Sequence, residues 1–100
     1  MTYLDTLAEE IRAAVRPDAL PPDDASGLFR MYAVLLLAKR DAVTRADIHN
    51  AWVAWMLDRG ELHASMVPFR ELPEETQQED SPFVLAVRTV ARRLCGRLSE

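Results

Sequence analysis

Glycine, cysteine and the motifs of common enzymes are scarce or missing in this sequence. Only three glycines and one cysteine, Cys95, occur among its 100 residues. A single cysteine excludes an internal disulfide and a cysteine-rich metal site. Gly-x-Ser-x-Gly, glycine-rich phosphate-binding and His-Glu-x-x-His motifs are absent, so no pattern supports catalysis. We therefore predict a non-enzymatic protein with no cofactor and no metal.

Two further absences narrow the location and the partners. The longest apolar run, from Met31 to Ala38, is far shorter than the roughly 20 residues that span a membrane. The N-terminus is acidic and amphipathic, unlike a signal peptide. These features predict a cytoplasmic protein that does not enter membranes. A net charge of −4 argues against nucleic-acid binding, which depends on neutralising phosphates.

The residues that are abundant predict an all-α fold. Apolar residues make up 49% of the chain and charged residues 28%, which is typical of one globular domain over residues 1–100. Alanine and leucine favour helix, and apolar residues recur at helical spacing. We expect a small bundle of four main helices and one short acidic helix that starts at Pro73, with an irregular loop at about 61–72. The main helices are expected at about residues 2–16, 25–40, 45–59 and 81–98.

The helix ends carry start and stop signals, and one helix is expected to be central. A threonine with an aspartate three residues later has the spacing of a capping pair. The two such pairs are Thr2–Asp5 and Thr44–Asp47. Other expected boundaries are Asp23 or Asp24 at the start of the second helix, Gly60 at the end of the third, and Ser81 as the cap of the last. The second helix is apolar on almost every side, which predicts packing against several neighbours.

Both tryptophans and both histidines lie in one stretch, between residues 48 and 80. His49 and Trp52 are three residues apart, so their side chains should adjoin on one helix face, and Trp55 extends that face. They form either core packing with a histidine that bonds a loop carbonyl, or an aromatic wall with a titratable donor. His63 lies in a loop, where polar residues more often serve a site. Two histidines are too few for a zinc site.

A specific pattern follows the third helix, in the run HASMVPFRELPEETQQED from His63 to Asp80. Its characteristic residues are His63, Met66, Val67, Pro68, Phe69, Glu71, Leu72, Pro73, Glu74 and Asp80. The preceding helix has a histidine three residues before a tryptophan, His49 and Trp52. Residues from about 45 to 95 thereby resemble the RyR domain, the repeat of ryanodine receptors that also occurs in small bacterial and phage proteins. Residues from about 2 to 40 form a helical extension to this RyR-like part.

The resemblance implies a binding module, with nucleotides or nucleotide-derived molecules among the ligands of stand-alone members. The whole chain is also similar to a family of small, uncharacterised actinobacterial proteins, which implies no function. We expect a site between the tryptophan helix and the loop from His63 to Leu72, for a partner protein or a small nucleotide-like ligand. The candidate ligand-binding residues are His49, Trp52, Trp55, His63, Pro68, Phe69, Arg70 and Glu71.

Other interpretations stay open. Helices at about 25–40 and 45–59 could form a helix-turn-helix DNA-binding regulator, for which Arg45 and Asn50 are the available readers. An enzyme would need His49 and His63 to face a carboxylate in a deep cleft. The apolar faces could close within one chain or require a second copy, so a homodimer remains an option. The arginines expected to form a solvated face of the last helix are Arg88, Arg92, Arg93 and Arg97.

Overall fold

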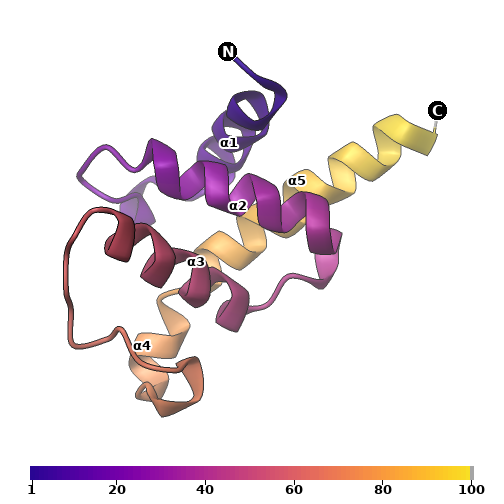
Figure 1. Ribbon diagram of the computed structural model, residues 1–100. Coiled ribbons are helices and arrows are strands. Elements are labelled where there is room, and N and C mark those ends of the chain that lie inside the picture. Colours follow the sequence, from indigo (N-terminus) through magenta and orange to yellow (C-terminus); the bar gives the residue numbers. More distant parts are fainter. Residues whose placement is uncertain (100) are drawn as a thin grey trace.

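Helices make up nearly all the regular structure, and the computed structural model shows them in the expected order (Figure 1). The structure describes the backbone of residues 1–99 and the side chains of residues 1–96, so the predicted roles of Arg97 and Leu98 lie outside the described side chains. Within residues 1–99 there is no strand. The elements are α1 (Tyr3–Ala14), the 3-10 turn η1 (Pro17–Ala19), α2 (Ser26–Lys39), η2 (Arg40–Ala42), α3 (Arg45–Asp58), η3 (Phe69–Glu71), α4 (Glu74–Gln78) and α5 (Ser81–Ser99). The predicted all-α fold, with four main helices and one short acidic helix, is confirmed.

The capping pairs act as their spacing predicts. In α3, the Thr44 hydroxyl accepts from the Asp47 amide at 3.3 Å, and the Asp47 carboxylate accepts from the Thr44 amide at 2.9 Å. The same reciprocal box opens α1. Asp24 accepts from the amide of Ser26 at 3.1 Å at the start of α2. Gly60 has a φ of 71°, the left-handed conformation that favours glycine after a helix.

The start of α5 differs from the expectation by one residue. Ser81 is the first helical residue and not the cap, because the carbonyl of Asp80 already accepts from the amides of Phe83 and Val84, both at 3.1 Å. Pro82 fits inside the first turn because an amide there has no partner within the helix. Pro73, likewise, precedes α4 and is not its first residue.

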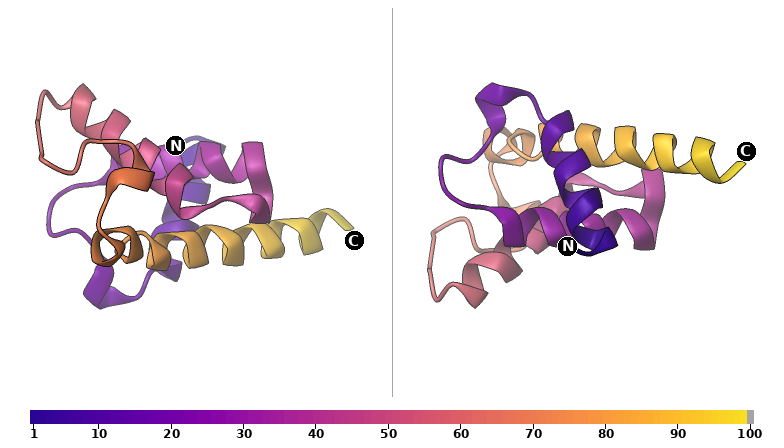
Figure 2. Two further views of the ribbon diagram at one scale, coloured as in Figure 1. Left: turned by 90° about the horizontal axis from the view of Figure 1, so that it is seen from below. Right: turned by 90° about the horizontal axis from the view of Figure 1, so that it is seen from above.

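Helix α2 lies at the centre of the fold, as its apolar composition predicts. It packs against α1, α3 and α5, and α1 and α3 also contact α5 (Figures 1 and 2). One side of α2 remains open, since Val34 is exposed. The far end of α5 projects beyond the other helices in both figures, and Ala91 is its last fully buried side chain among those described.

The core joins all the main helices. Its largest fully buried side chains are Ile11, Phe29, Tyr32, Leu36, Val43, Ile48, Val87 and Val90. Two aromatic rings of α2 meet edge to face, Phe29 and Tyr32 at 5.4 Å between centroids, and Phe83 of α5 lies 5.7 Å from Tyr32. Rings at these distances add about 0.5–1.5 kcal/mol per pair beyond area burial. The aromatic contacts therefore fix the start of α5 against the middle of α2.

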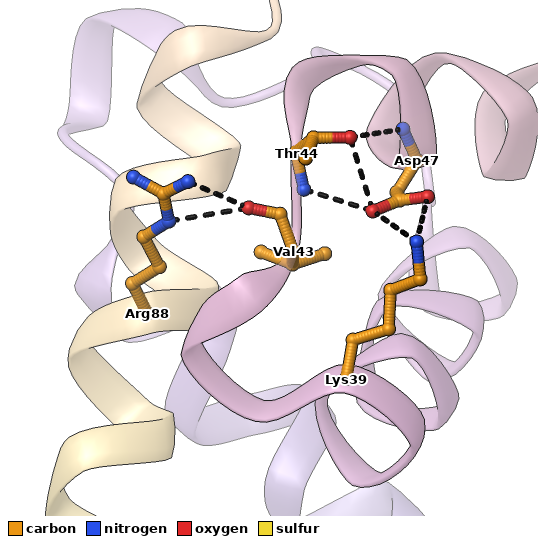
Figure 3. A network of polar contacts seen from close by, with 5 residues as sticks. All are labelled: Lys39, Val43, Thr44, Asp47 and Arg88. Atoms are coloured by element: carbon orange, nitrogen blue, oxygen red, sulfur yellow. Dashed lines mark hydrogen bonds and ion pairs between the residues drawn. The ribbon is translucent and has the colours of Figure 1, made fainter.

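A polar network joins the end of α2 to α3, and α5 to the segment that precedes α3 (Figure 3). Lys39 at the end of α2 donates to both carboxylate oxygens of Asp47, at 2.9 and 3.0 Å. Arg88 of α5 donates from Nε and Nη2 to the carbonyl of Val43, at 3.2 and 2.9 Å. The two bonds to Asp47 and the two to Val43 fasten the segment around the η2 turn to α3 and to α5.

Arg88 corrects one expectation. It was expected to belong to a solvated arginine face, but it is half-buried and satisfies a backbone carbonyl of the interior residue Val43. Arg92 and Arg93 are exposed, as expected. Across the described residues, none of the helices has the length and apolar character required to cross a bilayer.

Candidate functional site

A cavity of about 260 Å³ opens where α2, α3, the loop after α3, α4 and the first turn of α5 meet. Its walls are mostly aromatic and aliphatic, with a few polar groups. The lining residues are Pro21, Leu28, Tyr32, His49, Trp52, Trp55, His63, Ser65, Leu72, Thr76, Glu79, Asp80 and Phe83. Apolar walls with a few convergent polar groups are the usual composition of a ligand site.

The structure brings half of the predicted site residues to this cavity. Those that line it are His49, Trp52, Trp55 and His63. Those that do not are Pro68, Phe69, Arg70 and Glu71. The Phe69 ring lies behind the cavity wall, 6.0 Å from the His49 ring and under the guanidinium of Arg45 at 5.7 Å. Arg70 and Glu71 are exposed on the η3 turn.

Helix α3 supplies one aromatic wall. Trp52 stacks on His49 with centroids 5.8 Å apart, and the His63 ring meets Trp52 edge-on at 5.5 Å. Trp55, one turn further along, carries the guanidinium of Arg59 over its ring at 4.4 Å. Its indole also lies against α2, where a Cβ placed on Gly27 would be 3.4 Å from Nε1. The Trp52 ring is therefore held by His49 and His63, and the Trp55 ring by Arg59 and α2.

His49 has a structural bond within this wall. Its Nε2 donates to the carbonyl of Val67 at 2.7 Å, and the residue is only 3% exposed. A histidine that bonds a loop carbonyl beside a tryptophan is one of the two arrangements expected from the sequence. The bond ties α3 to the loop segment just before η3.

Further bonds give the loop one conformation. His63 Nδ1 accepts from the amide of Ser65 at 3.0 Å, so Nε2 carries the proton in the neutral ring. Gln77 of α4 donates from Nε2 to the carbonyls of Phe69 and Leu72, both at 3.1 Å. Leu72 is buried under this contact. Sequence reasoning missed Gln77, because an amide within a polar stretch has no pattern that distinguishes it from a solvated residue.

The opposite wall contains two polar groups that the sequence analysis did not assign to the site. Tyr32 of α2 is 2% exposed, and no hydrogen bond to its hydroxyl occurs among the described residues. Asp80 is half-buried, and its carboxylate likewise has no hydrogen-bond partner among residues 1–96. Burial, together with the negative charge of Asp80, raises the pKa of the Tyr32 phenol above its usual value. The phenol therefore stays protonated and able to donate at any physiological pH.

Asp80 is the most perturbed carboxyl group beside the cavity. Burial raises its pKa from 3.8 to about 6, and the neighbouring charge of Glu79 contributes in the same direction. His49 and Arg45 act in the opposite direction and lower it. A carboxyl group with this pKa is ionised at neutral pH, and its burial makes the ionised form less favourable than it would be in water.

The cavity is acidic. Glu79 and Asp80 line it, and the lining contains neither lysine nor arginine. Two arginines outside the lining make other contacts. Arg45 lies 3.8 Å from the Glu74 carboxylate and over Phe69, although its charge also lowers the pKa of Asp80. Arg59 lies over Trp55 and 3.4 Å from Glu61. Groups of three or more histidine, cysteine, aspartate or glutamate side chains suitably placed for a metal ion do not occur among the described residues.

Comparison with known proteins places the chain in a family. No curated protein and no solved structure matches it. A family model described as "Domain of unknown function (DUF7701)" matches residues 2–92, which includes every residue that lines the cavity. The match ends at the same turn of α5 as the buried core, whose last described member is Ala91. The chain therefore belongs to the DUF7701 family.

Proposed function

We propose that this protein is a non-enzymatic binding module that holds a small ligand, or one side chain of a partner protein, in the cavity beside Trp52. The observation that carries the proposal is the composition of that cavity: aromatic walls around two polar groups, Tyr32 and Asp80, that have no partner among the described residues. Neither oxygen is shut off from solvent without a partner, so both are open to the cavity and available to a ligand that bonds them.

The RyR-domain resemblance supports the same site. Its motif residues are far apart in the sequence, yet several meet at the cavity. These are His49, Trp52, His63, Leu72 and Asp80. The resemblance implies a binding module, and the convergence of these residues at one cavity supports the proposal.

The alternatives receive less support. His49 is almost fully buried, and its Nε2 is bonded to Val67, so it is poorly placed for proton transfer. Arg45, which a DNA-reading α3 would need, is engaged with Glu74 and Phe69. A nucleotide is also less suitable than a smaller molecule. Its phosphates would meet Glu79 and Asp80 without a cation, and about 260 Å³ is below the usual range of drug-sized sites, about 300–1,000 Å³.

A ligand screen with a blocked cavity tests the proposal. Tryptophan fluorescence and thermal shift would be recorded against nucleotides, amines, carboxylates and neutral aromatic compounds. Ser65→Phe places a ring at the cavity mouth, and Ala64→Phe is its control, because Ala64 is exposed and does not line the cavity. We expect at least one compound to stabilise the wild type and Ala64→Phe but not Ser65→Phe. Equal responses in all three proteins, or none in any, would remove the cavity as the binding site.

A further inference from the structure

We propose that the occupant of this cavity is a small organic amine in its protonated form, with its ammonium group at Asp80 and Tyr32 and its hydrocarbon body between the aromatic walls. The inference rests on the proposed function and adds the chemical class of the ligand. It follows from the shape of the cavity, from its charge, and from its polar groups that have no hydrogen-bond partner among the described residues.

The walls suit a flat or branched apolar body. Trp52, with His49 and His63, forms one side, and the ring pair of Tyr32 and Phe83 lines the same cavity from α2 and α5. Aromatic faces also attract cations through their electron-rich centres. The chain already has such contacts near the cavity, where Arg59 lies 4.4 Å above Trp55 and Arg45 lies 5.7 Å above Phe69. The walls therefore favour a ligand that is apolar over most of its surface and positive at one end.

The charge of the cavity selects that positive end. Glu79 and Asp80 supply the charged side chains of the lining, and both are acidic. An anionic ligand would be repelled by both carboxylates, and a neutral one would add nothing to the favourable effect of His49 and Arg45 on the Asp80 carboxylate. A cation would relieve the cost that burial imposes on the Asp80 carboxylate, since an opposite charge nearby favours the charged form.

The hydrogen-bonding groups define the cation further. Asp80 offers acceptor oxygens and Tyr32 a hydroxyl, and neither has a partner among the described residues. An ammonium group with N–H donors can bond to the carboxylate and to the phenol oxygen together, as charge-assisted hydrogen bonds. A quaternary ammonium cannot, because it has no N–H. A primary or secondary amine therefore completes the site best.

Three compounds of nearly equal size test the charge directly: 2-phenylethylamine, 2-phenylethanol and phenylacetate. Their affinities would be measured by calorimetry at pH 7.5 with the wild-type protein. We expect the amine to bind about tenfold more tightly than the alcohol, because of one charge-assisted contact, and phenylacetate to bind most weakly. Equal affinities of amine and alcohol, or a preference for phenylacetate, would overturn the inference.

Variants then assign the contact to Asp80. Asp80→Asn should lower the affinity for the amine about tenfold and leave that for the alcohol unchanged. Glu75→Gln is the matched control: it removes an exposed carboxylate of α4 that does not line the cavity, and both affinities should stay as in the wild type. If Asp80→Asn does not fold, Tyr32→Phe tests the second contact of the ammonium group, that with the phenol oxygen, and the pH dependence of the wild type tests the contact with Asp80. An unchanged preference for the amine in the folded variant would overturn the assignment.

The pH dependence gives an independent readout in the unmodified protein. The groups that face Asp80 are Tyr32 from α2, His49 and Arg45 from α3, and the adjacent Glu79. Lowering the pH from 7.5 to 5 protonates Asp80, so affinity for the amine should fall by about tenfold while affinity for the alcohol stays constant. A constant affinity for the amine over this range would contradict a contact with ionised Asp80.

Failure of the inference and failure of the proposed function are distinguishable. If the alcohol binds as well as the amine and Ser65→Phe blocks both, the cavity is a ligand site without selectivity for cations. The inference of an amine is then wrong, and the proposed function stands. If Ser65→Phe blocks no compound of the series or of the wider screen, the inference and the proposed function are both wrong. Lysine that is acetylated at its α-nitrogen, with a methylamide at its carboxyl end, keeps its side-chain amine and mimics a lysine within a protein. If it binds more tightly than 2-phenylethylamine, the occupant is a lysine side chain of a partner protein and not a small molecule.

Discussion

His49 and Val67 are joined by a hydrogen bond of 2.7 Å, from the imidazole Nε2 to the backbone carbonyl, across eighteen residues of chain. This bond determines where the loop after α3 lies relative to Trp52. The loop places His63 against Trp52 and Leu72 in the cavity lining. The cavity therefore depends on one imidazole that is not itself free to act on a ligand.

His49→Phe should destabilise the protein by about 1–3 kcal/mol, because it keeps an aromatic ring beside Trp52 but leaves the carbonyl of Val67 without its donor. Urea denaturation followed by tryptophan fluorescence measures the loss. Asn50→Ala, at the exposed neighbouring position, is the control and should change the free energy of unfolding by less than about 0.5 kcal/mol. Equal stability of His49→Phe and wild type would show that the bond carries no net energy.

Asp80→Asn should stabilise the protein at pH 7.5. The folded state raises the pKa of Asp80 from 3.8 to about 6, so between these values the folded protein binds more protons than the unfolded chain. Stability from this group is complete below pH 4 and is lost as the pH rises through about 6.

Denaturation of both proteins at several pH values checks this sign. Asp5, Asp24 and Asp47 have lowered pKa values and give the opposite slope in acid, but they are present in both proteins and cancel in the difference. The variant should exceed the wild type above pH 6, and the two should converge below pH 4. A difference that does not vary with pH would contradict the raised pKa.

Arg88→Met should cost about 1–3 kcal/mol, because the carbonyl of the buried Val43 loses both of its bonds from the guanidinium. Thermal and urea denaturation measure the change. Arg92→Met, one turn further along α5 and exposed, is the matched control and should have little effect. Similar losses in the two variants would mean that charge, and not the bond to Val43, is what matters.

Gln77→Met should loosen the loop around η3. The amide of Gln77 bonds two loop carbonyls, those of Phe69 and Leu72, and methionine keeps the length of the side chain without its donor. Trypsin cleavage after the exposed Arg70 reports this opening, and a loss of about 1 kcal/mol should accelerate it about fivefold. In Gln78→Met, which removes only an exposed contact with Glu74, the cleavage rate should stay near that of the wild type.

The sequence alone predicted the helices well, because their signals are local. Thr44 and Asp47 satisfy one turn of backbone, and Gly60 adopts the conformation that ends a helix. These effects need no knowledge of the rest of the chain. The one-residue error at Ser81 arose because a serine before a proline has the composition of a cap, while the carbonyl of Asp80 takes that role.

The site was predicted only in part, because the residues that line the cavity are determined by how distant segments of the chain pack together. Trp52 and His63 are unusual residues in a readable pattern, and both line the cavity. Tyr32 was missed because its helix is apolar on almost every side, so periodicity does not identify the side that faces a cavity. Glu71 was included because it belongs to a distinctive motif and Arg70 because it lies within the same run, yet both are exposed on the η3 turn.

The projecting end of α5 has a practical consequence. Phe83 in its first turn lines the cavity, and at a rise of about 1.5 Å per residue the backbone of Ser99 lies roughly 24 Å further along the helix axis. A biotin tag, a fluorescent reporter or a sensor chip attached at that end stays remote from the cavity mouth. A protein tethered there keeps the cavity mouth at a distance from the point of attachment.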